Sequence, residues 1–400
     1  MKLTSSRSAL GLAVGALGLA CLIPPAPAQA ATTGWRVYDQ LPVDRGGFVA
    51  ELTSIAVVSA TDAWAVGASF DDVGTGPAVV LHWTGKAWTH VKLPAKVAAF
   101  WNANGGGEAV DAIGASSAHS VWAFDGSGGF IHLSGRGWTT GTVPGASDGF
   151  LRTVTVSTVK VFSPTDVWIF GGISKGAHFA VAIPYAAQFN GRKWVRRAIP
   201  GSGAVAGVSA TSERDMWAVA GPTGASSGVG TASVLRWTGK RWRPVTVQPP
   251  KLPRGAGWTS IDIRSGRDVW VAGGGASPAG RGSGTPERIY HWTGKRWSAT
   301  ALPARASAKE FNMVSLAPDG SGMWGLDSIV ITPMLGGPTP GVTPCSTIWH
   351  LTGPKWTGPT VLSASACLYQ FASVAGGDST WAVGTSLSDL LIALAGPAPR

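Results

Sequence analysis

Three acids and two tryptophans are the side chains of this 400-residue sequence best placed to bind or transform a ligand. Each falls in or beside a segment that leads into an expected strand: Trp101, Glu108, Asp111, Trp258 and Asp262. Hydrolysis of a glycosidic bond commonly uses two carboxyl groups about 5–10 Å apart. An exposed indole ring beside a carboxylate instead binds a sugar or a peptide side chain without any reaction. The sequence leaves both chemistries open, together with simple packing of the two rings.

Histidines raise the question of a metal site. Four of the seven stand at one place in a repeated segment where other copies have glutamine or arginine: His82, His132, His291 and His350, against Gln188 and Arg236. Copies related by rotation hold these side chains far beyond the roughly 2 Å ligand distances of a shared metal. We therefore predict no metal site and no cofactor. The motifs HExxH and GxxxxGK[ST] are also absent from the sequence.

The elements that must position the candidate residues are repeated strands. The segment "LHWTGKAW" at 81–88 returns as "IHLSGRGW", "AQFNGRKW", "LRWTGKRW", "YHWTGKRW" and "WHLTGPKW". One full unit alternates β-branched and aromatic runs with tight turns, which is typical of short strands. It divides into strands a, b, c and d at 53–59, 63–68, 79–83 and 88–93.

Two tryptophans per unit give the number of repeats. The tryptophan of strand b occurs seven times, as Trp64, Trp122, Trp168, Trp217, Trp270, Trp324 and Trp381. The tryptophan that opens strand d occurs six times, and "GWRVYDQLP" at 34–42 matches the missing outer strand. An N-terminal strand that completes the last sheet removes the open edges of a ring. The sequence therefore predicts an all-β protein in which 31–400 form a single seven-bladed β-propeller. We expect four-stranded antiparallel blades and one-plus-three closure by the N-terminal strand.

The phrase "TDAWAVG…HWTGKAW" resembles the repeats of secreted bacterial β-propellers in the broad kelch and galactose-oxidase-like group. This group includes many uncharacterised exported proteins of high-GC Gram-positive bacteria, and the resemblance covers residues 34–396. The resemblance implies the fold but not the activity, because binding modules, lyases, hydrolases and oxidases all share this architecture. A copper site of the galactose-oxidase type is not implied, because the chain has four tyrosines and no matching cysteine motif.

The first thirty residues have the features of a secretory signal peptide. Lys2 and Arg7 precede an apolar stretch, and Ala28-Gln29-Ala30 forms a small-x-small cleavage site, so we expect cleavage after Ala30 and export. No later stretch is long and apolar enough for a membrane-spanning helix. Lipidation at Cys21 is an alternative. In an oxidising compartment Cys345 and Cys367 are expected to form a disulfide, the alternative being two buried thiols.

Basic residues gather in the expected c–d turns of a chain whose net charge is +11. They predict a ring around one rim of the propeller, formed by Lys86, Arg136, Lys193, Lys240, Arg241, Lys295 and Arg296. Such a ring favours an anionic cell-wall polymer or an acidic glycan. Nucleic acid would satisfy the charge alone, but we do not expect it as a partner. Ordinary solvated turn residues are the alternative.

Three functional hypotheses remain. In the first, an exported propeller binds a carbohydrate or an extracellular protein through its variable b–c and d–a loops, because irregular loops on a rigid scaffold commonly carry binding. In the second, it is a polysaccharide lyase or glycoside hydrolase that uses acids at the channel mouth. In the third, it is a structural or adhesion protein held to anionic cell-wall polymer by the basic ring.

Overall fold

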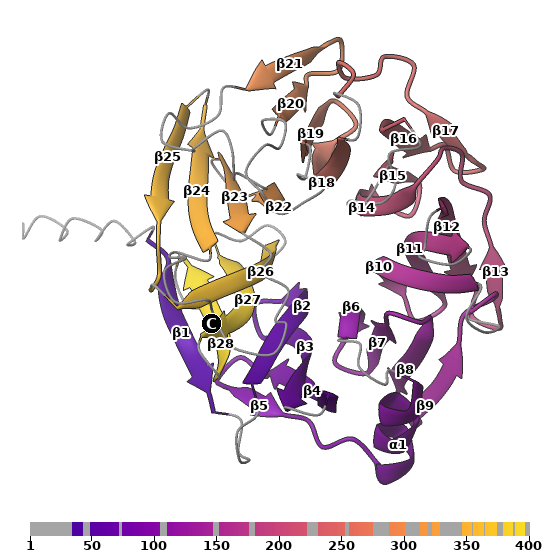
Figure 1. Cartoon of the computed structure of the whole chain (residues 1–400), viewed down its shortest axis with the longest axis vertical. Helices are drawn as coiled ribbons and strands as arrows, with labels where there is room; N and C mark the ends of the chain where they lie inside the picture. The colour runs from indigo at the N-terminus through magenta and orange to yellow at the C-terminus, as the bar shows by residue number, and fades with distance from the viewer. Residues whose placement is uncertain are drawn as a thin grey trace, which may run out of the picture.

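The structure is a computed structural model, which describes residues 34–42, 49–71, 74–104, 110–146, 152–175, 181–221, 231–252, 256–274, 288–300, 313–318, 322–328, 346–353, 355–363, 365–373, 379–386 and 389–396. These residues form seven four-stranded antiparallel sheets arranged like blades around a central axis (Figure 1). The predicted fold class is confirmed.

The first six blades follow one another along the chain, each with its first strand nearest the axis. The first contains β2 (Val49–Ser59), β3 (Asp62–Asp71), β4 (Gly74–Trp83) and β5 (Trp88–His90); the second contains β6 (Val110–Ser117), β7 (Ser120–Asp125), β8 (Gly129–Ser134) and β9 (Gly137–Thr142). The third contains β10 (Arg152–Ser163), β11 (Asp166–Lys175), β12 (Val181–Phe189) and β13 (Trp194–Arg196); the fourth contains β14 (Ala204–Ser212), β15 (Asp215–Gly221), β16 (Ser233–Trp237) and β17 (Trp242–Pro244). The fifth contains β18 (Gly257–Ser265), β19 (Asp268–Gly274), β20 (Arg288–Trp292) and β21 (Trp297–Thr300); the sixth contains β22 (Met313–Pro318), β23 (Gly322–Ser328), β24 (Ser346–Thr352) and β25 (Lys355–Thr360).

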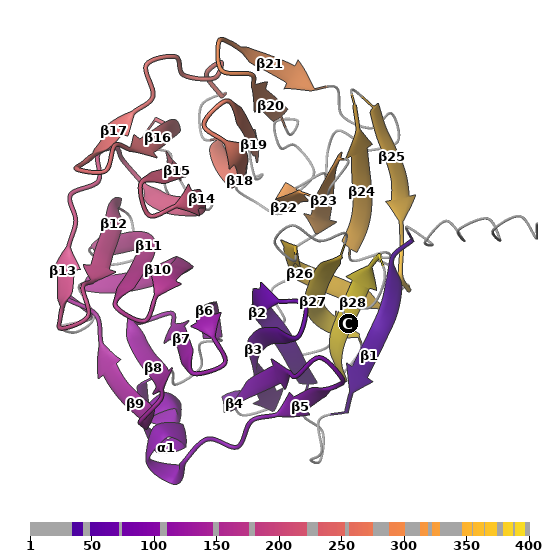
Figure 2. The ribbon, with the colours of Figure 1, turned by 180° about the vertical axis from the view of Figure 1, so that it is seen from behind.

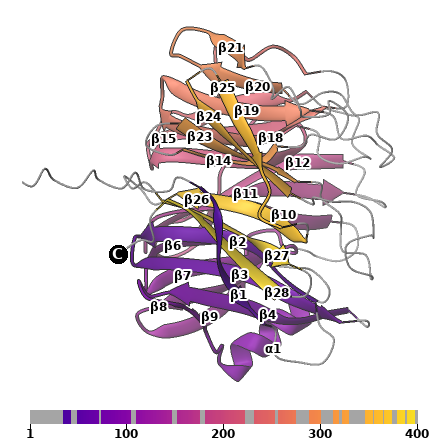
Figure 3. The ribbon, with the colours of Figure 1, turned by 90° about the vertical axis from the view of Figure 1, so that its left-hand side faces the viewer.

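The seventh blade joins both ends of the described chain. It contains β26 (Ala366–Ser373), β27 (Thr380–Ser386) and β28 (Asp389–Ala395), and its outermost strand is β1 (Arg36–Leu41). The pairing of β1 with β28 is antiparallel and can be followed from behind in Figure 2 and from the side in Figure 3. Arg36 adds a hydrogen bond from Nη1 to the Gly396 carbonyl at 2.7 Å. The predicted one-plus-three closure is therefore confirmed.

Every innermost strand carries a β-bulge at the same position. The residues at the irregularity are Thr53, Asp111, Ser157, Ala206, Thr259, Val314 and Tyr369. A bulge bends a strand and redirects a side chain, and bulges are common beside functional sites. Three of the bulge hydroxyls donate to carbonyls of the neighbouring strand: Thr53 to Val66, Ser157 to Phe170 and Thr259 to Ala272.

The hydrophobic core lies between the blades and consists largely of the repeated tryptophans. Trp381 of the seventh blade contacts Tyr38 of β1 at 5.0 Å and Trp83 of the first blade at 5.4 Å. Glycine is required three residues after Trp64, because a Cβ at Gly67 would overlap the Glu51 carbonyl of β2. The c–d turns need a backbone conformation that glycine adopts most readily, as at Gly85, where φ is 85°.

Candidate functional site

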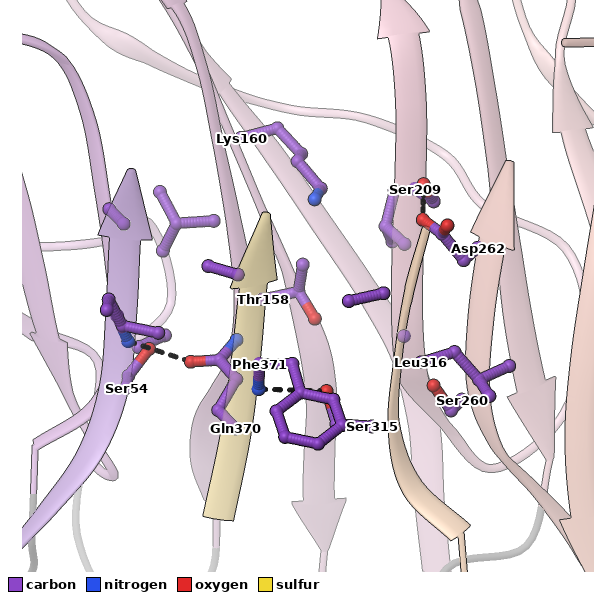
Figure 4. A pocket seen from close by; sticks show the side chains of 18 of the residues that line it. Ser54, Thr158, Lys160, Ser209, Ser260, Asp262, Ser315, Leu316, Gln370 and Phe371 are labelled. Carbon is purple, nitrogen blue, oxygen red and sulfur yellow. Dashed lines mark hydrogen bonds between the residues drawn. The ribbon is translucent and has the colours of Figure 1, made fainter. Parts of the chain in front are cut away.

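The seven innermost strands enclose an axial cavity of about 880 Å³. Because these strands do not pair with one another, side chains connect neighbouring blades around the cavity wall. The Ser54 hydroxyl accepts a hydrogen bond from the Ile113 amide at 3.2 Å, and Gln370 Oε1 accepts one from the Ile55 amide at 2.8 Å. Figure 4 shows part of this wall, where polar side chains reach the cavity from several blades.

One row of cross-strand neighbours runs through each blade from the cavity outward. In the first blade Ala56 on β2 faces Trp64 on β3, which faces His82 on β4. All seven blades keep this register. We call each set of cross-strand neighbours that passes through a strand b tryptophan a tryptophan row. The inner ends of the seven rows are Ala56, Gly114, Lys160, Ser209, Asp262, Ala317 and Ala372. Four of the seven are alanine or glycine, so charge enters this level only from the third and fifth blades.

Lys160, Ser209 and Asp262 reach this level from three consecutive blades (Figure 4). The Ser209 hydroxyl donates to Asp262 Oδ1 at 2.9 Å and accepts from the Ile263 amide at 3.2 Å. The other carboxylate oxygen, Oδ2, is buried and has no hydrogen-bond partner within the described part of the chain. The structure thus brings together a cation, a hydroxyl group and a carboxylate with one unused acceptor.

The two charged groups are half-buried side chains of the cavity wall. Burial raises the pKa of Asp262 from 3.8 to about 6, although the hydrogen bond from Ser209 and the charge of Lys160 both favour the ionised form. Burial lowers the pKa of Lys160, which the charge of Asp262 partly offsets. Buried ionisable groups that perturb each other in a cavity are typical of functional sites, although structural networks produce them too. A polar ligand group between them would supply the interactions that water supplies to exposed charges.

A second polar pair, formed by Tyr369 and Glu51, lies nearer the start of the innermost strands. The Tyr369 hydroxyl of the seventh blade bonds to Glu51 of the first, and burial raises the pKa of both groups. Among the described residues that line the cavity, Asp262 is the only carboxylate. The described wall therefore does not present the paired acids that glycoside hydrolysis commonly uses.

The expectation of exposed rings at Trp101 and Trp258 is wrong. Trp101 lies on α1 (Ala95–Asn104), where a loop was expected, and is 3 % exposed in a cluster with Trp64. Trp258 lies on β18, is also 3 % exposed and meets the Tyr290 ring edge-on at 6.0 Å. Both indoles fill apolar space between blades, so neither presents a ring face to a ligand.

The three predicted acids have different outcomes. Asp262 lies on the innermost strand of the fifth blade and lines the axial cavity with Ser209. Asp111 is the bulge residue of β6, and its side chain lies outside the described residues, as does all of Glu108. The sequence reasoning did not select Lys160 or Ser209. Both stand eight residues before the strand b tryptophan, as Ala56 and Asp262 do, and that offset would have revealed them.

At the outer ends of the tryptophan row, histidines stack on the strand b tryptophans. The ring centroids are 3.9 Å apart for His82 and Trp64, and three further pairs match: His132 on Trp122, His291 on Trp270 and His350 on Trp324. In the first blade Asp62 accepts hydrogen bonds from Trp64 Nε1 at 3.0 Å and from His82 Nε2 at 2.9 Å. These histidines belong to separate blades and separate stacks.

The second blade lacks the turn aspartate and has Ser120 in its place. Within the described residues, His132 Nε2 is buried without a hydrogen-bond partner. Burial lowers the pKa of His132 from 6.5 to about 4.

All seven predicted ring residues are exposed on the c–d turns: Lys86, Arg136, Lys193, Lys240, Arg241, Lys295 and Arg296. Their placement in the turns is as predicted, while the binding of an anionic polymer stays a prediction.

Cys367 lies on β26, but Cys345 and residues 1–30 lie outside the described residues, so the disulfide and the signal peptide also stay predictions. No three His, Cys, Asp or Glu side chains of the described residues form a group that could hold a metal ion. In the same residues, no helix has the length and apolarity needed to cross a membrane.

The fold and the axial cavity define the chain as a seven-bladed β-propeller. No protein-family model and no curated protein matches its sequence. Similar solved structures include YCF48 bound to D1 peptide, at 11 % identity and a TM-score of 0.53, covering 88 % of this chain and 97 % of that one. YCF48 from Cyanidioschyzon merolae has 14 % identity, a TM-score of 0.55 and coverages of 92 % and 99 %. The Cps50 (Swd1) β-propeller domain from Myceliophteria thermophila has 8 % identity, a TM-score of 0.51 and coverages of 90 % and 99 %. At these identities the likeness concerns the fold alone.

Proposed function

We propose that this protein is an exported, non-catalytic binding module that holds a segment of a partner protein at its axial cavity. One observation carries the proposal: Lys160, Ser209 and Asp262 stand at the inner ends of three consecutive rows, while the other four rows end in alanine or glycine. A scaffold without a ligand has no need to place a half-buried cation and carboxylate there, because partial burial without full pairing costs stability.

The chemistry of the pair favours a polypeptide segment. A peptide group carries a donor and an acceptor on opposite sides. Its N–H matches the unused Oδ2 of Asp262, and its carbonyl matches the ammonium group of Lys160. YCF48, a propeller of the same fold, has been solved with a peptide bound, which supports this choice of ligand class.

Export rests on the signal-peptide features of residues 1–30, and membership of the kelch and galactose-oxidase-like group rests on the repeat motif. Carbohydrate is the competing ligand. The two indoles expected to stack on a sugar are buried, and this favours a polypeptide at the cavity.

The test is to pan the full-length purified protein against a random-peptide display library and, in parallel, a glycan array. We expect peptides to be enriched, and their affinity to fall about tenfold in both Lys160→Met and Asp262→Asn. The exposed Lys355→Ala provides a charge-matched control and should change affinity by less than about twofold. Peptide affinity should also weaken below about pH 6 as Asp262 becomes protonated, and Asp262→Asn should abolish this dependence.

Two outcomes would contradict the proposal. Peptides whose affinity is the same for wild type and both cavity variants would place binding elsewhere on the molecule. Binding of glycans but not of peptides would show that the ligand is a carbohydrate. Release of reducing ends from a bound glycan would show that the protein is an enzyme.

A further inference from the structure

A groove of about 670 Å³ lies between blades four and five, beside their a–b and c–d turns. It shares no lining residue with the axial cavity. One side is formed by β17 and the residues that follow it, and the other by the turn between β18 and β19 together with Trp292 and Gly294.

Hydrogen bonds fix the β17 side of the groove. Gln248 accepts from the Val234 amide and donates to the carbonyls of Val234 and Val245, each at 2.9 Å. Trp297 of the fifth blade donates its indole N–H to the Val247 carbonyl at 2.8 Å. Because these backbone groups already have partners, the segment is poorly suited to pairing with an extended peptide as an added strand.

Three arginines line the groove: Arg236 on β16, Arg243 on β17 and Arg267 in the turn after β18. Arg236 pairs with Asp215 at 3.1 Å and lies 5.2 Å over the Trp217 ring. Within the described part of the chain, Arg243 and Arg267 have no carboxylate within ion-pair distance. The groove thus holds two exposed guanidinium groups whose charge no described carboxylate balances.

An aromatic side chain completes the groove. Trp292 is half-buried, and its ring centroid lies 5.5 Å from that of Trp297. A guanidinium group binds a carboxylate through two parallel hydrogen bonds, and an indole accommodates the apolar face of a ring. A ligand that uses both features carries carboxylates on cyclic units.

The geometry points to this groove as a binding site for an acidic polysaccharide, with its carboxylates on Arg243 and Arg267 and a sugar ring against Trp292. An acidic peptide supplies the charge without the ring. A neutral polysaccharide supplies the ring without the charge. The site is independent of the axial cavity and of any ligand held there.

The experiment titrates the full-length protein with polygalacturonate at about 50 mM salt, where surface charges are weakly screened. We expect the double variant Arg243→Ala/Arg267→Ala to lower the affinity at least about tenfold. The double variant Arg243→Lys/Arg267→Lys keeps the charge but loses the planar fork of each guanidinium group, and should lower the affinity by about threefold. Trp292→Leu keeps an apolar side chain and should also weaken polygalacturonate binding, with thermal unfolding used to verify that the variant folds.

The charge-matched control is Lys86→Ala/Arg136→Ala, which removes two exposed cations from the c–d turns of blades one and two. It should change the affinity by less than about twofold. An equal loss in the control would show that the whole rim attracts anions and would overturn the site. Equal affinity for polyglutamate with no effect of Trp292→Leu would make the ligand an acidic peptide and overturn the proposal, as would no binding of polygalacturonate to the wild type.

Discussion

The inner and outer ends of the tryptophan row share one register but differ in how their polar groups are partnered. At the outer end of the first blade, Asp62 accepts from both Trp64 and His82, and the imidazole stacks on the indole. At the inner end of the fifth blade, Asp262 accepts from Ser209 with one oxygen and from no described group with the other. The outer cluster recurs with the same geometry around Asp268 of the fifth blade.

The difference separates scaffold from site within a repeat. A polar cluster that recurs with its hydrogen bonds made is explained by the stability of each blade. Polar side chains that interrupt a ring of small residues and keep an unused acceptor are not explained in that way. Departure from the repeat and incomplete pairing also occur together at the outer end of the second blade, where His132 Nε2 has no described partner, so it is the axial cavity beside Asp262 that marks the inner end as the candidate site.

Replacing a strand b tryptophan, the middle residue of a tryptophan row, should have the largest effect on the free energy of unfolding. Trp381 is fully buried and contacts the rings of Tyr38, Trp83 and Trp88. Trp381→Ala should lower the free energy of unfolding by about 3–5 kcal/mol, measured by urea denaturation. Trp381→Phe should cost less, because part of the ring contact survives. A loss below about 1 kcal/mol for the alanine variant would contradict the role given to the row.

The outer end of the second blade, which lacks the turn aspartate, should lose stability in acid. His132 has a folded-state pKa of about 4, so it stays neutral while the unfolded chain takes up a proton below about pH 6.5. Stability is therefore lost as pH falls from about 6.5 to 4, by up to about 2 kcal/mol, because solvent screening at this half-buried ring reduces the effect. His132→Gln should remove this part of the loss, measured by denaturation at about pH 7 and 4.5, with the exposed His90→Gln as the baseline. An unchanged pH profile would contradict the burial argument.

At the inner end of the fifth blade, stability should depend on pH in the opposite direction. The folded-state pKa of Asp262 is about 6, above its ordinary 3.8, so the folded protein binds the proton more tightly and loses stability as pH rises between these values. Asp262→Asn keeps an acceptor for Ser209 and should raise the free energy of unfolding at about pH 7.5 by about 2 kcal/mol. The gain should disappear near pH 4. A variant less stable than wild type at neutral pH would mean that Asp262 is already fully satisfied.

Replacing the aspartate at an outer end by alanine should have the smallest effect on the free energy of unfolding. Asp62→Ala leaves Trp64 Nε1 and His82 Nε2 without their shared acceptor and should cost about 1–2 kcal/mol in a urea titration. Asp268→Ala in the fifth blade removes the same two contacts and should give a matching loss. Unequal losses would show that the two clusters are not equivalent parts of the scaffold.

Sequence reasoning predicted the fold well because each repeat carries its own tryptophans and turn residues. Repetition fixed the blade count, and the extra outer strand at 34–42 fixed the closure. The site was predicted less well, since burial is a property of the packed ring. Trp101 and Trp258 lie outside the repeated positions and looked like loop residues, yet both complete the packing between blades. Lys160 and Asp262 lie 102 residues apart in sequence and share a level only after the strands close around the axis.

The pairing of β1 with β28 also sets an order of assembly. The hydrogen bond between Arg36 and Gly396 spans 360 positions, so the first strand has no partner until nearly the whole chain has been synthesised. Six blades can form from local contacts, but ring closure requires a long-range encounter, which is slow and leaves the edge of β28 exposed meanwhile. A circular permutant that moves residues 34–42 to follow residue 396 would convert this last encounter into a local hairpin and shorten the time spent with an open ring.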